Sequence, residues 1–539
     1  MKTHEVTNQP PPLVDYNAFE RDPDLIEAVN QDGAAWAHSQ LLEFGKLVGS
    51  EQVIQWGFEA NENPPVLHTH DRFGNRRDEV TFHPAWHDLM RLSIEHQLHC
   101  LPWREPRPGA HVARAALLML ASQNEAGHTC PLSMTYASIP VIRKQVEIAR
   151  EWQGHILQPN YDIRFVPVAE KAGALIGMGM TEKQGESDVR MNTTSARPLG
   201  NGQYLLTGHK WFCSAPMSDA FLVLAQAPGG LSCFFLPRWT PHGERNRFHL
   251  QRLKNKLGNR SNASAEVEFD AAWARIIGDE GRGIATIMEM VNYTRLDCVL
   301  GSAGLMRQAV TQAIHHARHR KAFGKFLVEQ PAMQNVLADL YLESAAATIL
   351  ALRLASAVDR SNASEKERCF ARLAIAAAKY WVTKRCPGQV AEALECLGGN
   401  GYVEDCSMPR LHRESPLNSI WEGSGNVNCL DVLRILAKEP ESRESFFAEI
   451  RLCKGADSRL DATIETLEAS LTHAPTECDA RRTSEKLALI LQASLLIRHG
   501  PSNLAEAFCS SRIAGDWGHN FGTLPAATDF QTILDRAWA

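Results

Sequence analysis

The spacing of apolar residues changes twice along the chain, and each change predicts a different kind of secondary structure. From about Asp24 to Trp152 the apolar runs have the length and spacing of helices. The stretch Ala113–Ala121, rich in alanine, leucine and methionine, contains no helix breaker. The first twenty residues are polar and include Pro10-Pro11-Pro12, so we expect an irregular arm before the first helix.

Between about Leu175 and Phe269 the pattern becomes that of short strands. Apolar residues alternate with glutamates, as in a strand with one wet face, along Ala265, Glu266, Val267, Glu268 and Phe269. Two short apolar runs, 221–224 and 233–236, lie on either side of the turn signal Pro228-Gly229-Gly230. We therefore predict a β domain of about a hundred residues.

Helical spacing returns after Gly283. Apolar residues follow the i, i+3, i+4, i+7 pattern of one helix face at Met306, Ala309, Val310, Ala313 and Ala317. Segment 286–436 is typical of long antiparallel helices in a bundle. The residues after Pro440 indicate further helices and a glycine-containing tail.

These changes define the predicted fold, which is mainly α with a central β-barrel domain. We place an N-terminal helical domain with its arm at 1–160, the barrel at 161–285, a C-terminal helical bundle at 286–440 and a helical extension at 441–539. A length of 539 residues agrees with several domains, because domains average roughly 100–200 residues.

Composition places the chain among ordinary globular proteins. Apolar residues make up 44% and charged residues 22%, which excludes a disordered, collagen-like or disulfide-stapled chain. The formal net charge is −6, so bulk basicity does not indicate a nucleic-acid partner, although a local basic patch stays possible.

Cysteine usage and the absence of targeting signals indicate the cytoplasm. The 13 cysteines include no C-x-x-C pair, which favours reduced thiols over disulfides or a zinc site, and we expect no metal. The N-terminus lacks the apolar core of a signal peptide. The uncharged stretch Ala220–Pro237 is broken by its turn signal, so we expect two strands there and no membrane partner.

Two glycine- and tryptophan-containing segments are candidates for ligand binding. In 177–188 small residues let backbone amides approach a ligand, and Thr181 and Ser187 add hydroxyl donors for a flat polar ring or a phosphate. An ordinary glycine-rich loop is the alternative. In 208–214, Trp211 could pack against an aromatic cofactor, and a buried core tryptophan is the alternative.

Two further segments could supply charge. In 318–324 cationic side chains stand at a helix end, which fits either an exposed basic terminus or an anion site. Segments 398–402 and 420–426 precede a helix for which Ser424 is the expected N-cap, so backbone amides there could receive a ligand oxygen. Glu422 lies among apolar residues and glycines, where a carboxylate can act as a base; a solvated surface glutamate is the alternative.

In this order the four segments resemble the acyl-CoA dehydrogenase family of flavoproteins. The resemblance is carried over roughly residues 90–436 by Met180-Thr181-Glu182, Lys210-Trp211, Arg320 with Phe323-Gly324, Gly398-Gly399-Asn400-Gly401-Tyr402, and Trp421-Glu422-Gly423-Ser424. It implies a homotetramer with FAD bound non-covalently between the barrel and the C-terminal bundle. The family's tyrosine before the catalytic glutamate is Trp421 here, and Lys183 replaces a proline after Glu182.

The resemblance also implies roles for individual residues. Glu422 would remove the α-proton of an acyl-CoA while hydride leaves the β-carbon, and Thr294, at the alternative base position of some relatives, cannot serve. Thr181, Ser187 and Ser214 would also contact substrate. Arg320 would reach the FAD of a neighbouring subunit. The implied FAD contacts are Met178, Gly179, Met180, Thr181, Gly185, Ser187, Trp211, Phe212, Cys213, Ser214, Arg320, Ile420, Trp421, Gly423, Ser424, Gly425 and Asn426.

A narrower resemblance is to the branch of this family tied to the adaptive response to DNA alkylation. It rests on segments 8–11, 63–67, 82–87 and 259–264, together with 180–184 and 418–426. It implies binding of double-stranded DNA through the extension, with weak or specialised dehydrogenase activity of the isovaleryl-CoA kind. From Glu441 onward there are 10 Lys/Arg and 14 Asp/Glu, and the candidate phosphate contacts are Arg481, Arg482, Lys486 and Arg498.

Two alternatives remain at this stage. The chain could be a metabolic acyl-CoA dehydrogenase with Glu422 as its base and no DNA role. It could also be a non-catalytic flavin-binding interaction module, for which Trp421 and Cys213 are the best arguments.

Overall fold

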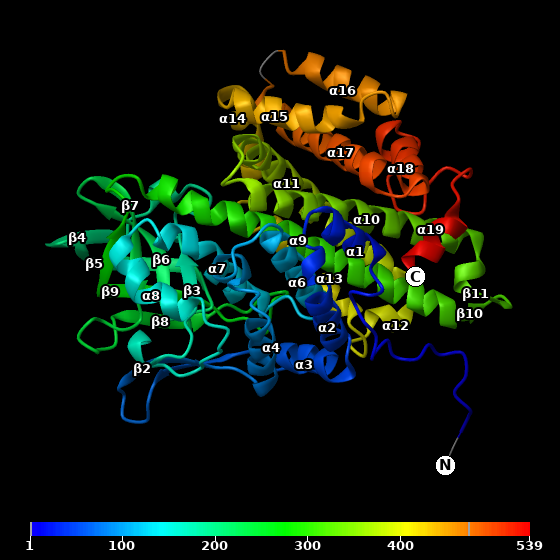
Figure 1. Cartoon of the computed structure of the whole chain (residues 1–539). Coiled ribbons are helices and arrows are strands. Elements are labelled where there is room, and N and C mark those ends of the chain that lie inside the picture. Colours follow the sequence, from blue (N-terminus) through cyan, green and yellow to red (C-terminus); the bar gives the residue numbers. More distant parts are fainter. Residues whose placement is uncertain (1–2, 473–474, 539) are drawn as a thin grey trace. The chain divides into compact units, whose positions relative to one another are not determined.

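The structure is a computed structural model that describes residues 3–472 and 475–538 (Figure 1). Between Ile176 and Ile277 the chain forms a seven-stranded β-sheet, where the sequence pattern predicted short strands. The strands are β3 (Ile176–Gly179), β4 (Ser195–Gly200), β5 (Gln203–Ser214), β6 (Ala220–Ala227), β7 (Gly230–Pro237), β8 (Phe248–Leu253) and β9 (Ser264–Ile277). Their order is β3-β6-β4-β5-β9-β7, with β8 on β9, and an additional β6–β7 pairing closes the sheet into a barrel. The predicted central β-barrel is confirmed.

Because side chains alternate between the two faces of each strand, every second side chain points into the interior of the barrel. Phe221, Phe234, Phe248, Phe269 and Cys213 belong to one buried apolar cluster. Strands β6 and β7 are antiparallel and joined across the predicted turn, so the stretch Ala220–Pro237 is a hairpin, as expected from its sequence.

The helices and strands sort into two units, each assembled from separate stretches of sequence. The first comprises the chain up to Ile54, Pro108–Asn124 and the residues from Arg295 onward; the second comprises Gln55–Arg107 and Glu125–Thr294. Outside the barrel, the second unit contains α4 (Pro84–Glu95), α5 (Leu101–Arg104), α7 (Thr129–Ile142) and α8 (Val146–Ile156). The domain boundaries expected from the sequence stay predictions.

A hairpin interrupts the N-terminal segment that the sequence indicated as helical, and this corrects the prediction. Strands β1 (Val66–His70) and β2 (Arg76–Thr81) are paired antiparallel, and Leu67 and Val80 pack against the barrel cluster. Most other residues of these strands are polar, so few apolar positions were available to reveal the period of two.

Long helices dominate the first unit (Figure 1). They are α9 (Gly283–His319), whose residues to Thr294 belong to the second unit, α10 (Pro331–Arg360) and α11 (Glu365–Glu395). The apolar face predicted between Met306 and Ala317 is buried. The Ser364 hydroxyl caps α11 by accepting from the backbone N–H of Glu367 at 3.3 Å.

Shorter helices complete this unit. They are α1 (Pro23–Gln31), α2 (His38–Val48), α3 (Glu51–Glu62, which continues into the second unit), α6 (Ala110–Asn124), α12 (Gly399–Tyr402), α13 (Met408–Glu414), α14 (Gly425–Lys438), α15 (Pro440–Ile450), α16 (Ser458–Ser470), α17 (Ala480–His499), α18 (Ser502–Phe508) and α19 (Phe530–Ala537). The short strands β10 (Lys321–Ala322) and β11 (Lys325–Phe326) follow α9. The expected helical extension after Pro440 is thus present.

Helix α10 is long and apolar enough to cross a membrane by length and composition, and it is the one such helix in the described part of the chain. Other parts of the structure already bury 83% of its most apolar window. A core helix of a bundle has this character, so the apolar surface of α10 is explained by packing.

Candidate functional site

The loop after β3 is organised around the buried carboxylate of Glu182. Its Oε1 accepts from Nζ of Lys210 at 2.8 Å, and both side chains are fully buried. Its Oε2 accepts from the backbone N–H of Thr193 at 2.7 Å. Burial acts to raise the pKa of Glu182, but the Lys210 ammonium and the other donors outweigh it and lower that pKa to about 2. The ion pair therefore fixes the loop to β5.

This anchoring leaves the predicted ligand-facing residues of the loop accessible. Met178, Met180 and Thr181 are half-buried, and Ser187 is exposed. Gly179 and Gly185 are buried; a Cβ at Gly185 would lie 2.9 Å from Oδ1 of Asn192, so a side chain there would disturb the turn. The loop is accordingly a shaped backbone surface with hydroxyl groups.

Trp211 is half-buried, which excludes the alternative of a core tryptophan. Its backbone N–H donates to the carbonyl of Thr181 at 2.8 Å, joining β5 to the loop. Nζ of Lys254 lies 3.0 Å from the centroid of its ring, a cation–π contact. Phe212 is exposed, so two aromatic rings stand at this edge of the barrel.

The structure corrects the expectation for the Cys213 side chain. This thiol is fully buried in the barrel cluster, and burial raises its pKa to about 12. Cys213 can therefore offer a ligand only its backbone. Ser214 is half-buried, with its Oγ 3.4 Å from Oγ of Ser264, so the hydroxyl of Ser214 is the accessible donor at this end of β5.

In the first unit, Glu422 has a backbone conformation that is rare for a side-chain-bearing residue. Its φ is +57° and that of Gly423 is +91°, both in the left-handed region. The side chain is half-buried, which differs from the alternative of a freely solvated glutamate. Such a conformation persists only where the surroundings hold it.

Two buried cations hold this turn. Nζ of Lys379 donates to the carbonyls of Trp421 at 2.8 Å and Gly423 at 2.5 Å, and Nε of Arg295 donates to the carbonyl of Glu422 at 3.1 Å. Three consecutive carbonyls thus receive charged donors. Arg295 is itself paired with Asp431 at 2.7 Å. The turn is fixed by charge-assisted hydrogen bonds from α9 and α11.

The residues on either side of Glu422 are positioned less uniformly. Nε1 of Trp421 donates to Oδ1 of Asn418 at 2.9 Å, while Ile420 is exposed. Ser424 is the N-cap of α14, as predicted, but its hydroxyl makes no capping hydrogen bond. Gly425 is buried in the first turn, and the side chain of Asn426 is exposed.

The basic end of α9 is exposed at Arg318 and half-buried at Arg320. Nη1 of Arg320 donates to the carbonyl of Asn8 at 2.6 Å. The side chain that was expected to reach the FAD of a second subunit is therefore hydrogen-bonded to the N-terminal arm of its own chain. Thr294, at the alternative base position, is buried, and its hydroxyl donates to the carbonyl of Val291 at 3.1 Å.

The four cations predicted to contact DNA lie on α17 in unlike environments. Arg481, Arg482 and Lys486 are exposed. Nε of Arg481 donates to Oδ1 of Asn426 at 2.8 Å. Nη1 of Arg498 is paired with Glu449 at 2.9 Å, so its charge is already balanced inside the unit. Arg482 and Lys486 are the better candidates for phosphate contacts.

The sequence analysis missed Lys379, Arg295 and the partnership of Glu182 with Lys210. A signal existed for Lys379, which follows three alanines on a buried helix face where a cation needs a partner. Metal binding is a separate question. Among residues 3–472 and 475–538, no group of three or more His, Cys, Asp or Glu side chains is arranged to hold a metal ion.

Family models match the chain in three consecutive segments. They are the adaptive response protein AidB N-terminal domain over residues 8–163, the acyl-CoA dehydrogenase middle domain over 177–272 and the acyl-CoA dehydrogenase C-terminal domain over 281–437. The chain is 46% identical over 510 residues to AidB, an acyl-CoA dehydrogenase homologue of Escherichia coli K12, covering 94% of each chain. It is 30% identical to acyl-CoA dehydrogenase family member 11 of Caenorhabditis elegans, over 80% of this chain and 73% of that one.

Among solved structures, the chain is similar to Caenorhabditis elegans ACDH-11 in complex with C11-CoA. The TM-score is 0.85 at 26% identity, covering 99% of this chain and 93% of the other.

The chain belongs to the acyl-CoA dehydrogenase family, and it is an FAD-dependent oxidoreductase of that type. Its N-terminal domain and its similarity to the Escherichia coli protein assign it, within the family, to the AidB group. The resemblance inferred from the sequence motifs is confirmed.

The residues present fit a flavin. Beside the barrel loop, a half-buried indole and an exposed phenyl ring stand near the accessible hydroxyls of Thr181 and Ser214. Aromatic faces combined with a few polar donors are what a flat, partly polar ring system requires.

Proposed function

We propose that this protein dehydrogenates an acyl-CoA thioester with Glu422 as the base. The single observation that carries the proposal is the left-handed turn at Glu422, held by Lys379 and Arg295 through three carbonyls. A left-handed backbone conformation that the surrounding residues hold at a carboxylate-bearing residue is typical of a functional site. The proposal draws support from the C11-CoA bound to the Caenorhabditis elegans relative.

The residues of this chain would act as follows. When bound, FAD supplies a two-electron acceptor for the hydride that leaves the substrate's β-carbon. The Glu422 carboxylate accepts the α-proton. As the family resemblance implies, the flavin would be held by Met178 to Thr181, Ser187, Trp211 to Ser214 and residues 420–426. The hydroxyl groups of Thr181, Ser187 and Ser214 would also contact the substrate.

The test is Glu422→Gln, which keeps the shape of the side chain and removes the base. We expect flavin reduction by mixed acyl-CoA thioesters, including isovaleryl-CoA, to slow by at least about 10²-fold under anaerobic conditions while FAD stays bound. The readout is the loss of the oxidised flavin absorption in stopped-flow. Glu441→Gln, at an exposed glutamate of α15, is the matched control. Unchanged reduction in Glu422→Gln would reject the assignment.

We further propose that the extension binds double-stranded DNA and that the protein acts in the response to DNA alkylation damage. The supports are the family model for an adaptive response protein and the exposed cations Arg482 and Lys486, one helical turn apart on α17. The balance of 10 Lys/Arg and 14 Asp/Glu after Pro440 means that any such contact is local. A metabolic acyl-CoA dehydrogenase without a DNA role is the alternative.

Salt dependence distinguishes these alternatives. We expect affinity for a labelled duplex to fall as salt rises, and the slope of log K against log salt to shrink by up to about 0.9 per lost phosphate contact in Arg482→Ala/Lys486→Ala. Fluorescence anisotropy at several salt concentrations measures both. Lys454→Ala, at an exposed lysine of the same extension, is the control. DNA affinity that does not respond to salt counts against the proposal.

A further inference from the structure

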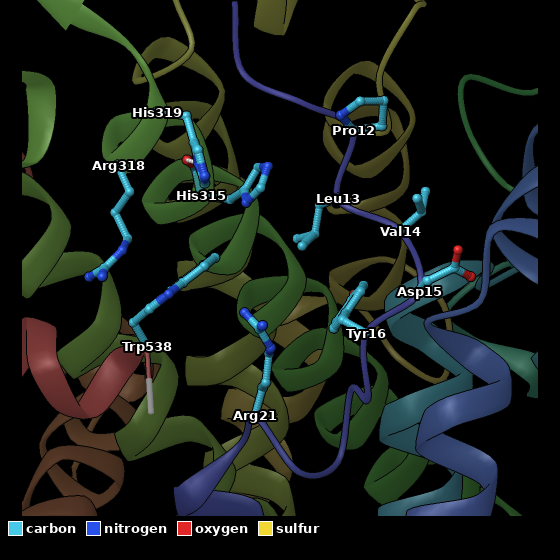
Figure 2. A pocket seen from close by; sticks show the side chains of 10 residues that line it. All are labelled: Pro12, Leu13, Val14, Asp15, Tyr16, Arg21, His315, Arg318, His319 and Trp538. Carbon is cyan, nitrogen blue, oxygen red and sulfur yellow. Dashed lines mark hydrogen bonds between the residues drawn. The ribbon is translucent and has the colours of Figure 1, made fainter.

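A cavity of about 470 Å³ lies in the first unit, outside every residue assigned above to FAD or substrate. Its walls come from the N-terminal arm, the last turns of α9 and the end of α19 (Figure 2). Figure 2 shows Pro12 to Tyr16 along one side and His315, Arg318, His319 and Trp538 along the other, with Arg21 between them at the bottom of the view. The volume is within the range of small-molecule sites.

Two guanidinium groups in the wall share one aromatic ring. The guanidinium carbons of Arg21 and Arg318 lie 5.0 and 5.2 Å from the centroid of Trp538. Neither arginine forms an ion pair with any residue in the described part of the chain. The acid in the wall, Asp15, accepts from the backbone N–H of Glu51 at 3.1 Å, and in Figure 2 it lies on the opposite side from Arg318. The cavity thus has an excess of positive charge.

A buried imidazole adds an unused polar atom. His315 is 8% exposed, and its Nε2 donates to the carbonyl of Pro11 at 2.8 Å. Its Nδ1 is buried without a hydrogen-bond partner among the described residues. The ring also stacks on Trp538 at 5.8 Å. A buried polar atom without a partner is unfavourable in the empty protein and is satisfied when a ligand supplies the partner.

We propose that this cavity binds the phosphate group of a small molecule. Planar guanidinium forks match phosphate oxygens in pairs, and the indole provides an apolar wall for whatever carries the phosphate. Nδ1 of His315 takes the remaining hydrogen bond, from a hydroxyl of the ligand. The arm and two helices form the walls of the cavity, and its volume of about 470 Å³ favours a small phosphate ester over the backbone of a nucleic acid.

The site is independent of the proposed dehydrogenase function. Its α9 residues precede Arg320, and the Arg320 side chain donates to the carbonyl of Asn8 and does not line the cavity. Loss of Glu422 would therefore leave binding here unchanged, and loss of this site would leave Glu422 in place.

The test is calorimetric titration of the full-length, FAD-loaded protein at constant ionic strength with inorganic phosphate and with phenyl phosphate. We expect binding of at least one probe, weakened by at least about tenfold in Arg21→Gln/Arg318→Gln, because two paired donors are removed. Arg197→Gln, at an exposed arginine of β4, should leave affinity within about twofold. Tighter binding of phenyl phosphate assigns an ester as the ligand, and equal binding assigns free phosphate.

A second readout protects the test against misfolding. The change in tryptophan fluorescence on adding phenyl phosphate should disappear in Trp538→Phe, while melting temperatures of all variants stay at the wild-type value. Absence of binding up to about 10 mM, far above useful affinity, overturns the proposal. So does equal binding by the double variant, or binding of a duplex oligonucleotide that needs Arg21 and Arg318 when neither phosphate probe binds.

Discussion

Lys379 is a buried lysine whose ammonium donates two hydrogen bonds to the backbone around another residue. The ammonium is almost inaccessible and bonds the carbonyls on either side of Glu422. Burial lowers the pKa of Lys379, and the nearby Glu422 carboxylate counteracts this shift. We therefore regard Lys379 as a positioning residue for the proposed base.

We predict that Lys379→Met, which keeps the length of the side chain, lowers kcat for acyl-CoA oxidation by about tenfold or more with a smaller change in KM, because the base loses its orientation. Two carbonyls left without donors should also cost about 1–3 kcal/mol of unfolding free energy each. Steady-state kinetics and urea denaturation measure the two effects. Lys384→Met, at an exposed lysine of the same helix, should change neither. Normal kcat in a destabilised Lys379→Met protein would limit Lys379 to a structural role.

Residues 213 and 214 show what an ordered strand adds to a motif. The sequence offered both a thiol and a hydroxyl as the donor near the flavin, and no periodic signal separated them. The strand turns Cys213 into the barrel core and leaves Ser214 accessible. Which neighbour faces a ligand depends on register, and a bulge lies between Lys210 and Cys213 in the pairing of β5 with β9.

At the scale of elements, the buried pair of Glu182 and Lys210 joins the loop after β3 to strand β5. The loop carries several predicted flavin contacts, so its position depends on this pair. Replacing one partner of a buried ion pair leaves the other charge uncompensated, which costs about 3–5 kcal/mol.

We predict that Glu182→Gln lowers the free energy of unfolding by about that amount and weakens retention of FAD. The pKa of Glu182 falls from 4.5 to about 2 on folding, so the carboxylate contributes stability above pH 4.5 that is lost as the pH falls toward 2. The wild type should therefore lose stability between these values, and Glu182→Gln should lose less. Chemical denaturation at several pH values measures this, with Glu186→Gln, at an exposed glutamate of the same loop, as control. Identical acid sensitivity in Glu182→Gln and wild type would contradict the linkage.

At the scale of the whole molecule, each of the two units is assembled from stretches that are far apart in the sequence. The first unit combines the chain up to Ile54, the internal segment Pro108–Asn124 and the residues from Arg295 onward. The N-terminal arm reaches the end of α9, where Asn8 and Arg320 are bonded. The phosphate cavity we propose depends on this long-range assembly, because its residues span Pro12 to Trp538.

We predict that the full-length protein is a homotetramer, as the family resemblance implies. Light scattering after size-exclusion chromatography should give a mass four times that of the 59.8 kDa chain. Arg320→Ala, which removes the side chain expected to reach the FAD of a neighbouring subunit, should weaken FAD retention while Arg197→Ala does not. A monomer that binds FAD with full affinity would reject both parts of the prediction.

The sequence alone determined the fold class, the barrel and its hairpin, the long helices and the family. Periodicity records which face of each element is buried, and a series of ordered motifs is far more specific than any one of them. The same information missed the polar hairpin β1–β2, since its strands contain few apolar residues.

Only the tertiary structure decided the partnerships between distant side chains. Tens to hundreds of residues separate the members of each pair along the chain. The pairs are Lys379 with the turn at Glu422, Glu182 with Lys210, and Arg21 with Trp538. The position of a buried charge depends on which partner can neutralise it, and that partner is selected by packing rather than by local spacing. For this reason the sequence indicated which residues could do chemistry, while the fold decided which of them are held, buried or exposed.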